Sequence, residues 1–214
     1  MKKRIALLVY PNFSLQEVSN LMWLFRWYYD TMSEVVYTEK EAVMSEEGIF
    51  VYPQKTCEEF QVEDYDCLIL PGCSDTRQAI QNKKLKSFLE RFSGIKDFII
   101  GAICSGPMFL AQAGLLKEKK YTDSLFVEMR DQFSFIEEDN FEAAPVVEAG
   151  NIITAQGSAF NDFAVHVARK LGYECPDKNL IWIIWITGKK KDYIHHLSKE
   201  RTTGISRRIS GILK

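Results

Sequence analysis

The stretch DFIIGAICSGPMFLAQAGLL, residues 97–116, decides the fold and contains the first candidate for chemistry. Its first residues are typical of a buried strand, and a helical pattern follows Cys104 with no loop between the two. A strand that turns directly into a helix leaves the junction residue at the carboxyl edge of the sheet, facing the first unpaired amides of the helix. Because helix amides favour a thiolate, the sequence predicts a reactive cysteine with a lowered pKa at residue 104.

Short apolar runs alternate with helical patterns on both sides of this junction. Strands are predicted at 4–10, 34–38, 67–71 and 97–103, and helices at 14–29, 82–92, 157–173 and directly after the junction. Alternation of this kind is typical of parallel strands with helices on both faces of the sheet. Two short hairpins are also expected, one turning at 46–48 and one turning at Gly150 and Asn151.

Length and composition predict one globular domain. With 214 residues, 46% of them hydrophobic and 13% aromatic, the chain can bury a sizeable core. We expect this domain over residues 1–175. A C-terminal extension over 176–214 is expected to be partly helical and basic, with a composition from Lys189 onward that is compatible with disorder.

Charge and cysteine content restrict the partners. The 27 basic and 29 acidic residues give a net charge of -2, so the chain lacks the excess of positive charge that is typical of nucleic-acid-binding proteins. No apolar run reaches membrane-spanning length. The five cysteines are irregularly spaced, which argues against a disulfide framework and against a CxxC-type zinc site. We therefore expect a cytoplasmic protein with a small-molecule substrate, no nucleic-acid or membrane partner, and no metal or cofactor.

Four segments together resemble the DJ-1/PfpI superfamily, whose members are relatives of the class I glutamine amidotransferases. The segments are LLVYPNFSLQEV after the first strand, CLILPGC at the third, GAICSGPMFLAQAGLL at the junction and TAQGSAFNDFAVHVARKL near the end of the domain. The resemblance is collinear from about Lys3 to Tyr173. It implies a flavodoxin-like three-layer sandwich with a mainly parallel central sheet, a nucleophile elbow at Cys104, and usually a dimer.

A homodimer is also expected because the chain carries apolar side chains that a monomer of this size would struggle to hide. The candidate interfaces are the face with Trp23 and Trp27, and the segment LIWIIWI at 180–186 with Trp182 and Trp185. That segment is expected either to pack on the core or to form a subunit contact.

Glu17 has two interpretations. Ser14 and Glu17 have the spacing of a capping box, in which the two side chains bond reciprocally at a helix start. The resemblance instead implies that Glu17, in the first helix, contacts the elbow thiol and sets its protonation. We favour a position beside Cys104.

Backbone amides are the expected oxyanion donors. The amide of Ser105 would face a charge that develops on an attacked substrate. The amide of Cys73, where many relatives have glycine, is the expected second donor, and Gly72 supports a tight turn before it.

A histidine is missing from the positions where related hydrolases have one. Residue 105 is serine, and in the segment KYTDSLF the aligned residue is Asp123. Asp123 is expected either to orient a water or substrate, or to cap a following helix. His166 lies off the apolar stripe of its predicted helix, so a Cys-His mechanism is doubtful.

Three functions are compatible with these residues. The first is a cysteine-dependent enzyme of the hydrolase, hydratase or deglycase type, in which Cys104 adds to a carbonyl, amide or nitrile-like carbon and Glu17 manages the proton. The second is a non-enzymatic redox-sensing or stress-response protein that is oxidised at Cys104. The third is a binding domain with a vestigial site. The sequence leaves the substrate open.

Overall fold

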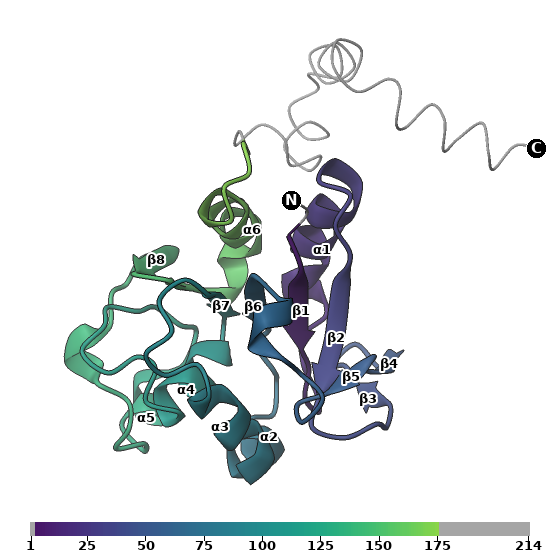
Figure 1. Ribbon diagram of the computed structural model, residues 1–214. Helices are drawn as coiled ribbons and strands as arrows, with labels where there is room; N and C mark the ends of the chain where they lie inside the picture. The colour runs from purple at the N-terminus through teal and green to yellow at the C-terminus, as the bar shows by residue number, and fades with distance from the viewer. Residues whose placement is uncertain (1–2, 176–214) are drawn as a thin grey trace, which may run out of the picture. The chain divides into compact units, whose positions relative to one another are not determined.

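The computed structural model describes residues 3–175 of the chain (Figure 1). The strands are β1 (Ile5–Leu8), β2 (Ser33–Tyr37), β3 (Val43–Met44), β4 (Phe50–Val51), β5 (Lys55–Thr56), β6 (Cys67–Leu70), β7 (Ile99–Ile103), β8 (Val146–Ala149) and β9 (Ile152–Ala155). The helices are α1 (Gln16–Tyr28), α2 (Arg77–Gln81), α3 (Lys83–Glu90), α4 (Gly106–Gln112), α5 (Val127–Arg130) and α6 (Phe160–Lys170). Short 3-10 turns cover Val62–Asp64, Glu138–Asn140 and Gly157–Ala159.

The central sheet has seven strands in the order β5-β2-β1-β6-β7-β9-β8. Every neighbouring pair is parallel except β8 and β9. The three strands predicted to be adjacent are adjacent, because β6 pairs with β1 on one side and with β7 on the other. The predicted parallel sheet, with Cys104 directly after the carboxyl end of β7, is confirmed.

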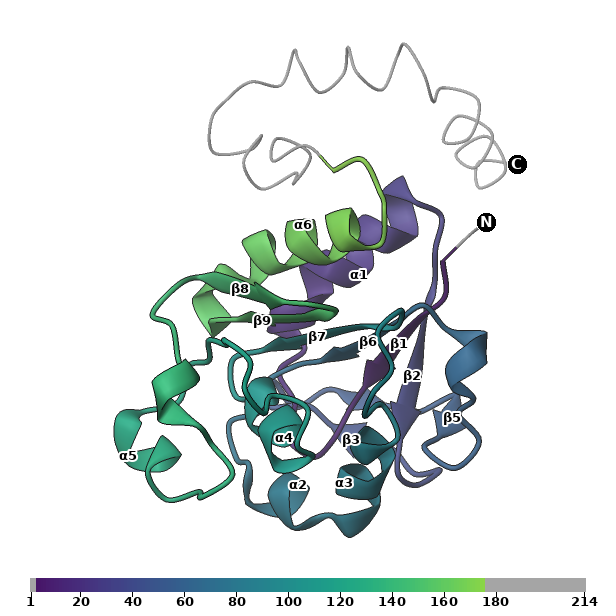
Figure 2. The ribbon, with the colours of Figure 1, turned by 60° about the vertical axis from the view of Figure 1, so that its left-hand side comes forward.

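Helices cover both faces of the sheet and complete a three-layer sandwich. Figure 2 shows α1 and α6 side by side on one face, and α2, α3 and α4 on the other. The central strands read as continuous apolar runs because both of their faces are buried, and β1 and β6 are buried at every residue. This arrangement confirms the predicted flavodoxin-like fold class.

Both predicted hairpins are present. β3 and β4 pair antiparallel around a turn at Gly48, whose φ is +80°, and β8 and β9 pair antiparallel around Gly150, whose φ is +64°. Glycine adopts these left-handed angles without the steric penalty of a side chain. The predicted helix at 82–92 begins as expected, since the Asn82 side chain caps α3 by accepting from the Leu85 amide.

Residues 176–214 lie outside the described part of the chain, and so do the expectations for the C-terminal extension and for Trp182 and Trp185. Within residues 3–175, no helix is long and apolar enough to cross a membrane.

Candidate active site

Cys104 lies at a sharp turn between β7 and α4. Its φ is +60°, in the left-handed region that a non-glycine residue seldom adopts, as predicted for the apex of a nucleophile elbow. Its N–H donates to the Ala155 carbonyl at 2.8 Å, and its carbonyl accepts from the Ser124 N–H at 3.0 Å. The main chain of β9 and of the 121–126 loop therefore holds the strained residue at both ends.

Glu17 lies beside this thiol and not in a capping box. The start of α1 has no side-chain cap of its own, and the Leu15 and Gln16 amides donate instead to the Glu47 carboxylate at 3.2 and 2.9 Å. Glu17 is thereby free to accept from the Gly72 N–H at 2.7 Å and to hydrogen-bond the Cys104 thiol. The capping-box interpretation is wrong, because Glu47 from the β3–β4 turn satisfies those amides.

Two glycines allow the thiol and the carboxylate to meet. A Cβ atom on Gly72 would lie 2.6 Å from Cys104 Cβ and 2.7 Å from Glu17 Oε2. A Cβ atom on Gly157 would lie 2.9 Å from Glu17 Oε1 and 3.2 Å from the Cys104 sulfur. All four separations are shorter than ordinary van der Waals contact. Each of the two positions therefore accepts only glycine without local movement. Gly72, expected to support a tight turn, therefore also packs directly against the thiol and the carboxyl group.

The electrostatics of the pair differ from the sequence-based expectation. Burial raises the pKa of the Cys104 thiol, and the charge of Glu17 raises it further, while the Ser105 amide and the Ser124 hydroxyl oppose the rise. Burial also raises the pKa of Glu17, against the bonds from the thiol and from Gly72. The expected lowering of the thiol pKa is therefore wrong, because burial and the carboxylate outweigh the helix amides. Each of the two groups therefore affects the protonation of the other.

The amides expected to hold an oxyanion have different partners. The Cys73 N–H donates to Ser105 Oγ at 2.8 Å, and Ser105 Oγ donates in turn to the Cys73 carbonyl at 3.2 Å. The Cys73 amide is thus engaged and does not point freely toward the thiol, which corrects its expected use as the second donor. The Ser105 amide does face the Cys104 sulfur. Burial raises the pKa of the Cys73 thiol to about 12.

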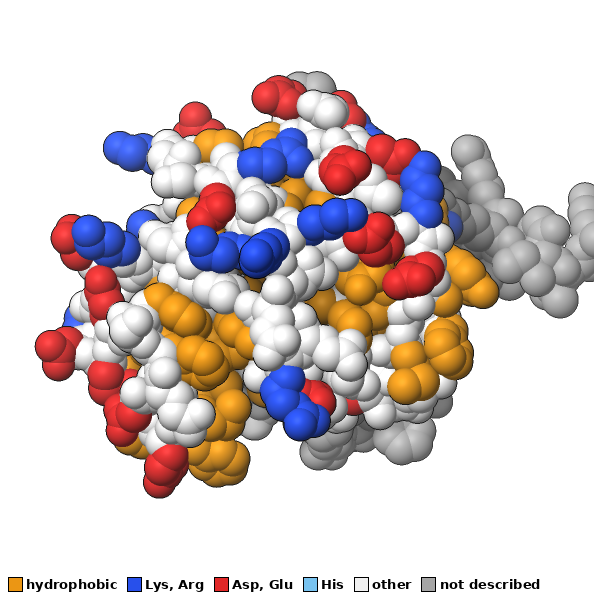
Figure 3. All heavy atoms as spheres, turned by 90° about the horizontal axis from the view of Figure 1, so that it is seen from below, with side chains coloured by type: hydrophobic (Ala, Val, Ile, Leu, Met, Phe, Trp, Pro, Cys, Tyr) orange, Lys and Arg blue, Asp and Glu red, His pale blue; other side chains and the backbone are white. Residues whose placement is uncertain are grey.

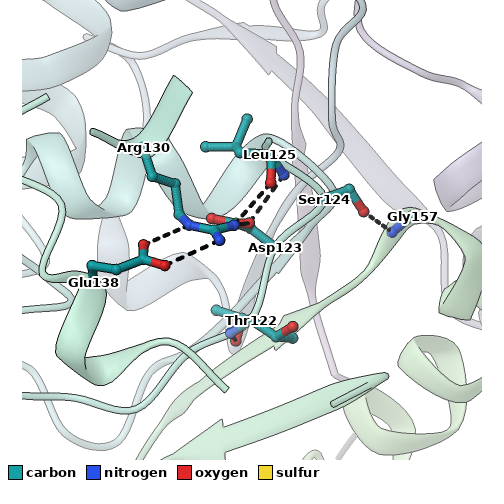
Figure 4. Close-up of polar contacts among 8 residues, drawn as sticks. Thr122, Asp123, Ser124, Leu125, Arg130, Glu138 and Gly157 are labelled. Atoms are coloured by element: carbon teal, nitrogen blue, oxygen red, sulfur yellow. Dashed lines mark hydrogen bonds and ion pairs between the residues drawn. The ribbon is translucent and has the colours of Figure 1, made fainter. Parts of the chain in front are cut away.

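Asp123 is held in a buried ion pair with Arg130 (Figure 4). Its Oδ1 accepts from Arg130 Nη1 at 2.9 Å and from the Leu125 amide at 3.0 Å. The expectation that Asp123 orients a water or substrate is corrected, because both of these partners belong to the scaffold. Burial raises the pKa of Asp123, and the Leu125 amide and the Arg130 guanidinium counter that rise.

Ser124, one residue further along, is the residue of this loop that reaches the thiol. Its Oγ accepts from the Gly157 N–H at 2.8 Å (Figure 4). The Ser124 hydroxyl also lowers the pKa of the Cys104 thiol against the effect of burial. Sequence reasoning selected Asp123 in this loop and did not single out Ser124, the next residue along the chain. The only available signal was the polar character of both residues.

Histidine does not serve the thiol in the described part of the chain. His166 is the single histidine between residues 3 and 175, and its Nδ1 lies 2.7 Å from Glu148 Oε1, on the edge strand β8. His195 and His196 lie outside the described residues, so the doubt about a Cys-His mechanism stays a prediction. Residues 3–175 also hold no group of three His, Cys, Asp or Glu side chains that could bind a metal ion.

These features define an α/β protein with a cysteine at a nucleophile elbow and a carboxyl group against the sulfur. The model of the DJ-1/PfpI family matches residues 3–170, and the chain belongs to that family. The "uncharacterized protease YoaZ" of Bacillus subtilis is 28% identical over 159 residues, covering 74% of this chain and 75% of the relative. Protein DJ-1alpha of Drosophila melanogaster is 29% identical over 135 residues, covering 61% of this chain and 60% of the relative.

Solved structures agree on the fold. A DJ-1 superfamily protein from Agrobacterium tumefaciens superposes with a TM-score of 0.76 at 23% identity, covering 88% of this chain and 100% of its own. A thiJ/pfpI family protein from Bacillus anthracis superposes with a TM-score of 0.76 at 24% identity, covering 92% of this chain and 96% of its own. At these identities the similarity supports the fold and does not indicate a substrate.

Proposed function

We propose that this chain is a cysteine-dependent enzyme that acts on a small electrophilic carbonyl compound through Cys104. The observation that carries the proposal is the contact between the Cys104 thiol and the Glu17 carboxyl group at a strained elbow. A carboxylate without a cation beside it, whose pKa is raised by burial, is a suitable base for a thiol proton. Membership of the DJ-1/PfpI family agrees with a cysteine-dependent enzyme role.

The proposed reaction begins with proton transfer from the Cys104 thiol to Glu17. The sulfur then forms a bond with the carbonyl carbon, and the π electrons of the C=O bond move to the oxygen. That oxygen takes the proton back from Glu17, which gives a neutral thiohemiacetal and leaves Glu17 ionised again. The Ser105 amide, which faces the sulfur, is the proposed donor to the oxygen while it carries charge.

Addition to a carbonyl suits this site better than amide hydrolysis does. Amide cleavage requires a proton for the leaving amine, which an imidazole beside the sulfur commonly supplies. Among residues 3–175 the one histidine is paired with Glu148, away from the elbow. Aldehyde addition needs no leaving group, and Glu17 alone handles its proton.

The test is turnover of a panel of small aldehydes, amides and isonitriles by the purified full chain. We expect consumption of at least one aldehyde, loss of that activity in Cys104→Ala, and strong reduction in Glu17→Gln. Cys67→Ala is the matched control, because Cys67 is a fully buried thiol on β6. Activity that persists in Cys104→Ala would refute the proposal.

Redox sensing is the second candidate, and one observation favours it. Cys104 is partly exposed, whereas Cys57, Cys67 and Cys73 are buried. Exposure and thiolate character together select the cysteine that is oxidised. Absence of turnover, combined with stoichiometric oxidation of Cys104 by one equivalent of hydrogen peroxide, would replace the enzymatic proposal by this one.

We also propose that the chain forms a homodimer. Apolar side chains gather in patches between charged residues when the molecule is seen from below (Figure 3). The large exposed apolar side chains include Phe50 and Tyr52 around β4, and Trp27 on α1 is 53% exposed. Large exposed apolar side chains of this kind are candidates for interaction surfaces. Sedimentation equilibrium at micromolar concentration should give twice the monomer mass, and a monomer there would refute the dimer.

A further inference from the structure

The geometry points to Ser124 as the second side-chain partner of the Cys104 sulfur, and to Arg130 as the positioning residue that holds the loop carrying Ser124. In this arrangement a hydroxyl group takes the place of an imidazole beside the nucleophile. The inference deepens the proposed function and rests on it, because it assigns a further residue to the same thiol.

Two hydrogen bonds fix the direction of the Ser124 hydroxyl group. Its Oγ accepts from the Gly157 N–H at 2.8 Å, so a lone pair is occupied and the single hydroxyl proton stays available for donation. The Ser124 N–H donates to the Cys104 carbonyl at 3.0 Å, which keeps the two residues side by side. The sulfur lies close to Gly157, since a Cβ atom there would be 3.2 Å from it, so the hydroxyl proton is available to the sulfur. The Ser124 hydroxyl lowers the pKa of Cys104 against the effect of burial.

The other titratable groups around the sulfur give it no positive partner. Glu17 approaches from α1, Cys73 follows β6, and Tyr10 follows β1, where its hydroxyl donates to the Pro71 carbonyl. Each of these groups is neutral or negative when it titrates. Within the described residues, neutral donors therefore stabilise the thiolate, and Ser124 is the side-chain donor among them.

Arg130 fastens the loop on both sides of Ser124. Its Nη1 donates to Asp123 Oδ1 at 2.9 Å and to the Leu125 carbonyl at 2.8 Å, so the residues before and after Ser124 are bound to one nitrogen (Figure 4). The arginine side chain is 5% exposed and the Asp123 side chain is 1% exposed. A buried, charge-assisted clamp of this kind holds a loop in one geometry.

The far side of the guanidinium is held as well. Arg130 Nε donates to Glu138 Oε2 at 2.6 Å and Nη2 donates to Glu138 Oε1 at 3.1 Å, in a two-point pair. The ring of Phe141 lies 4.0 Å from the guanidinium carbon. Asp123 is therefore a structural anchor, and Arg130 acts on the thiol only through the position of Ser124.

The first experiment measures the rate of Cys104 alkylation by iodoacetamide at fixed pH, followed by mass spectrometry of the peptide that contains Cys104. We expect Ser124→Ala to slow the reaction roughly tenfold at about pH 8, because loss of one hydrogen bond to the thiolate raises the pKa by about one unit. Ser124→Thr keeps the hydroxyl at an exposed position and should restore most of the rate.

Thr122→Val is the matched control for this loop. Thr122 Oγ1 is buried with no hydrogen-bond partner, so its removal should leave the alkylation rate unchanged. An unchanged rate in Ser124→Ala, an equal loss in Thr122→Val, or no rescue by Ser124→Thr would overturn the role of Ser124.

The second experiment is a double-mutant cycle with Arg130→Lys and Ser124→Ala, on proteins whose fold is checked by circular dichroism. If Arg130 acts through Ser124, the double variant alkylates no more slowly than Ser124→Ala alone. Multiplicative rate losses would overturn the positioning role. If Arg130→Lys does not fold, Glu138→Gln replaces it in the cycle. Glu138 is half-exposed and binds the same guanidinium, so its substitution weakens the hold on the loop. The alkylation rate of Glu138→Gln combined with Ser124→Ala then tests the positioning role.

These rates do not depend on turnover. A protein that consumes no carbonyl compound but shows the expected alkylation pattern would refute the proposed function and leave this inference standing. A protein that turns over aldehydes, but whose alkylation rate is unchanged by Ser124→Ala, would support the proposed function and refute this inference.

Discussion

Two carboxylates, the half-buried Glu17 and the buried Asp123, have opposite surroundings. Burial raises the pKa of each. Asp123 faces the Arg130 guanidinium at 2.9 Å, which balances its charge permanently. Glu17 faces the Cys104 thiol, and the charges that act on it, those of Glu46 and Glu47, are negative.

This difference separates a structural carboxylate from a chemical one. A carboxylate bonded to arginine has no reason to take up a proton near neutral pH, because the guanidinium stays charged. A carboxylate bonded to a thiol can exchange a proton with it, because the two groups compete for one charge. The partner, more than the residue type or the degree of burial, decides which carboxylate can serve as a base.

Arg130→Met tests the structural side of the comparison, and we expect its effect on stability to be the largest. Removal of the guanidinium leaves Asp123 buried without a compensating charge, which costs about 3–5 kcal/mol of unfolding free energy. Urea unfolding measures this loss. Arg77→Met, at an exposed ion pair with Asp75, is the control and should change stability little. Equal losses of unfolding free energy in Arg130→Met and Arg77→Met would contradict a special structural role for the buried ion pair.

Gly72→Ala tests the chemical side by separating Glu17 from the thiol. The new methyl group would overlap Cys104 Cβ at 2.6 Å and Glu17 Oε2 at 2.7 Å, so one of them must move. We expect a loss of about 1–3 kcal/mol from overpacking, with loss of aldehyde turnover. Gly157→Ala meets contacts of 2.9 Å and longer and should cost less. Full activity in Gly72→Ala would show that the contact is dispensable.

Glu17→Gln sharpens the comparison through the pH dependence of stability. The unfolded carboxyl group titrates near about 4.3, and burial raises the pKa of Glu17 in the folded state. Between these two values the folded state holds a proton that the unfolded state has lost, so stability falls as the pH rises. Glutamine carries no such proton, and the advantage of the variant should grow from about pH 4 upward until the folded pKa is passed.

Glu47→Gln supplies the control of opposite sign. Burial raises the pKa of Glu47, but the Gln16 and Leu15 amides outweigh this effect and leave the pKa lowered. Its stabilising contribution is therefore present above the unfolded pKa and is lost as the pH falls. Denaturant midpoints measured from about pH 2 to pH 8 check both variants, because the change due to Glu47 falls below the unfolded pKa of about 4.3. Parallel curves for Glu17→Gln and the unchanged protein would contradict the raised pKa of Glu17.

The sequence was sufficient for the fold because the sheet is buried on both faces. Continuous apolar runs such as CLILP at 67–71 and DFIIGAI at 97–103 have few other stable placements than central parallel strands. The turns at Gly48 and Gly150 were marked by residues that tolerate positive φ. These signals are local, and each can be recognised without its partner.

The site was predictable only where local geometry sets it. The elbow places Cys104 by itself, since a strand that turns directly into a helix leaves no other position for that residue. Asp123 and Ser124 could not be told apart, because their surroundings depend on tertiary contacts with Arg130, seven residues beyond Asp123, and with Gly157, 33 residues beyond Ser124. The same holds for Glu17, which is released from its helix start by Glu47.

The backbone bonds of Cys104 separate the holding of the nucleophile from the tuning of its reactivity. Its N–H and carbonyl are bound by main-chain atoms of Ala155 and Ser124, so those bonds survive a change of either side chain. The side chain at position 124 can therefore be exchanged while the sulfur stays in place. In such a fold, one substitution at position 124 can change the proton donor to the sulfur while the backbone bonds that hold Cys104 stay in place. New chemistry can therefore arise at the same nucleophile.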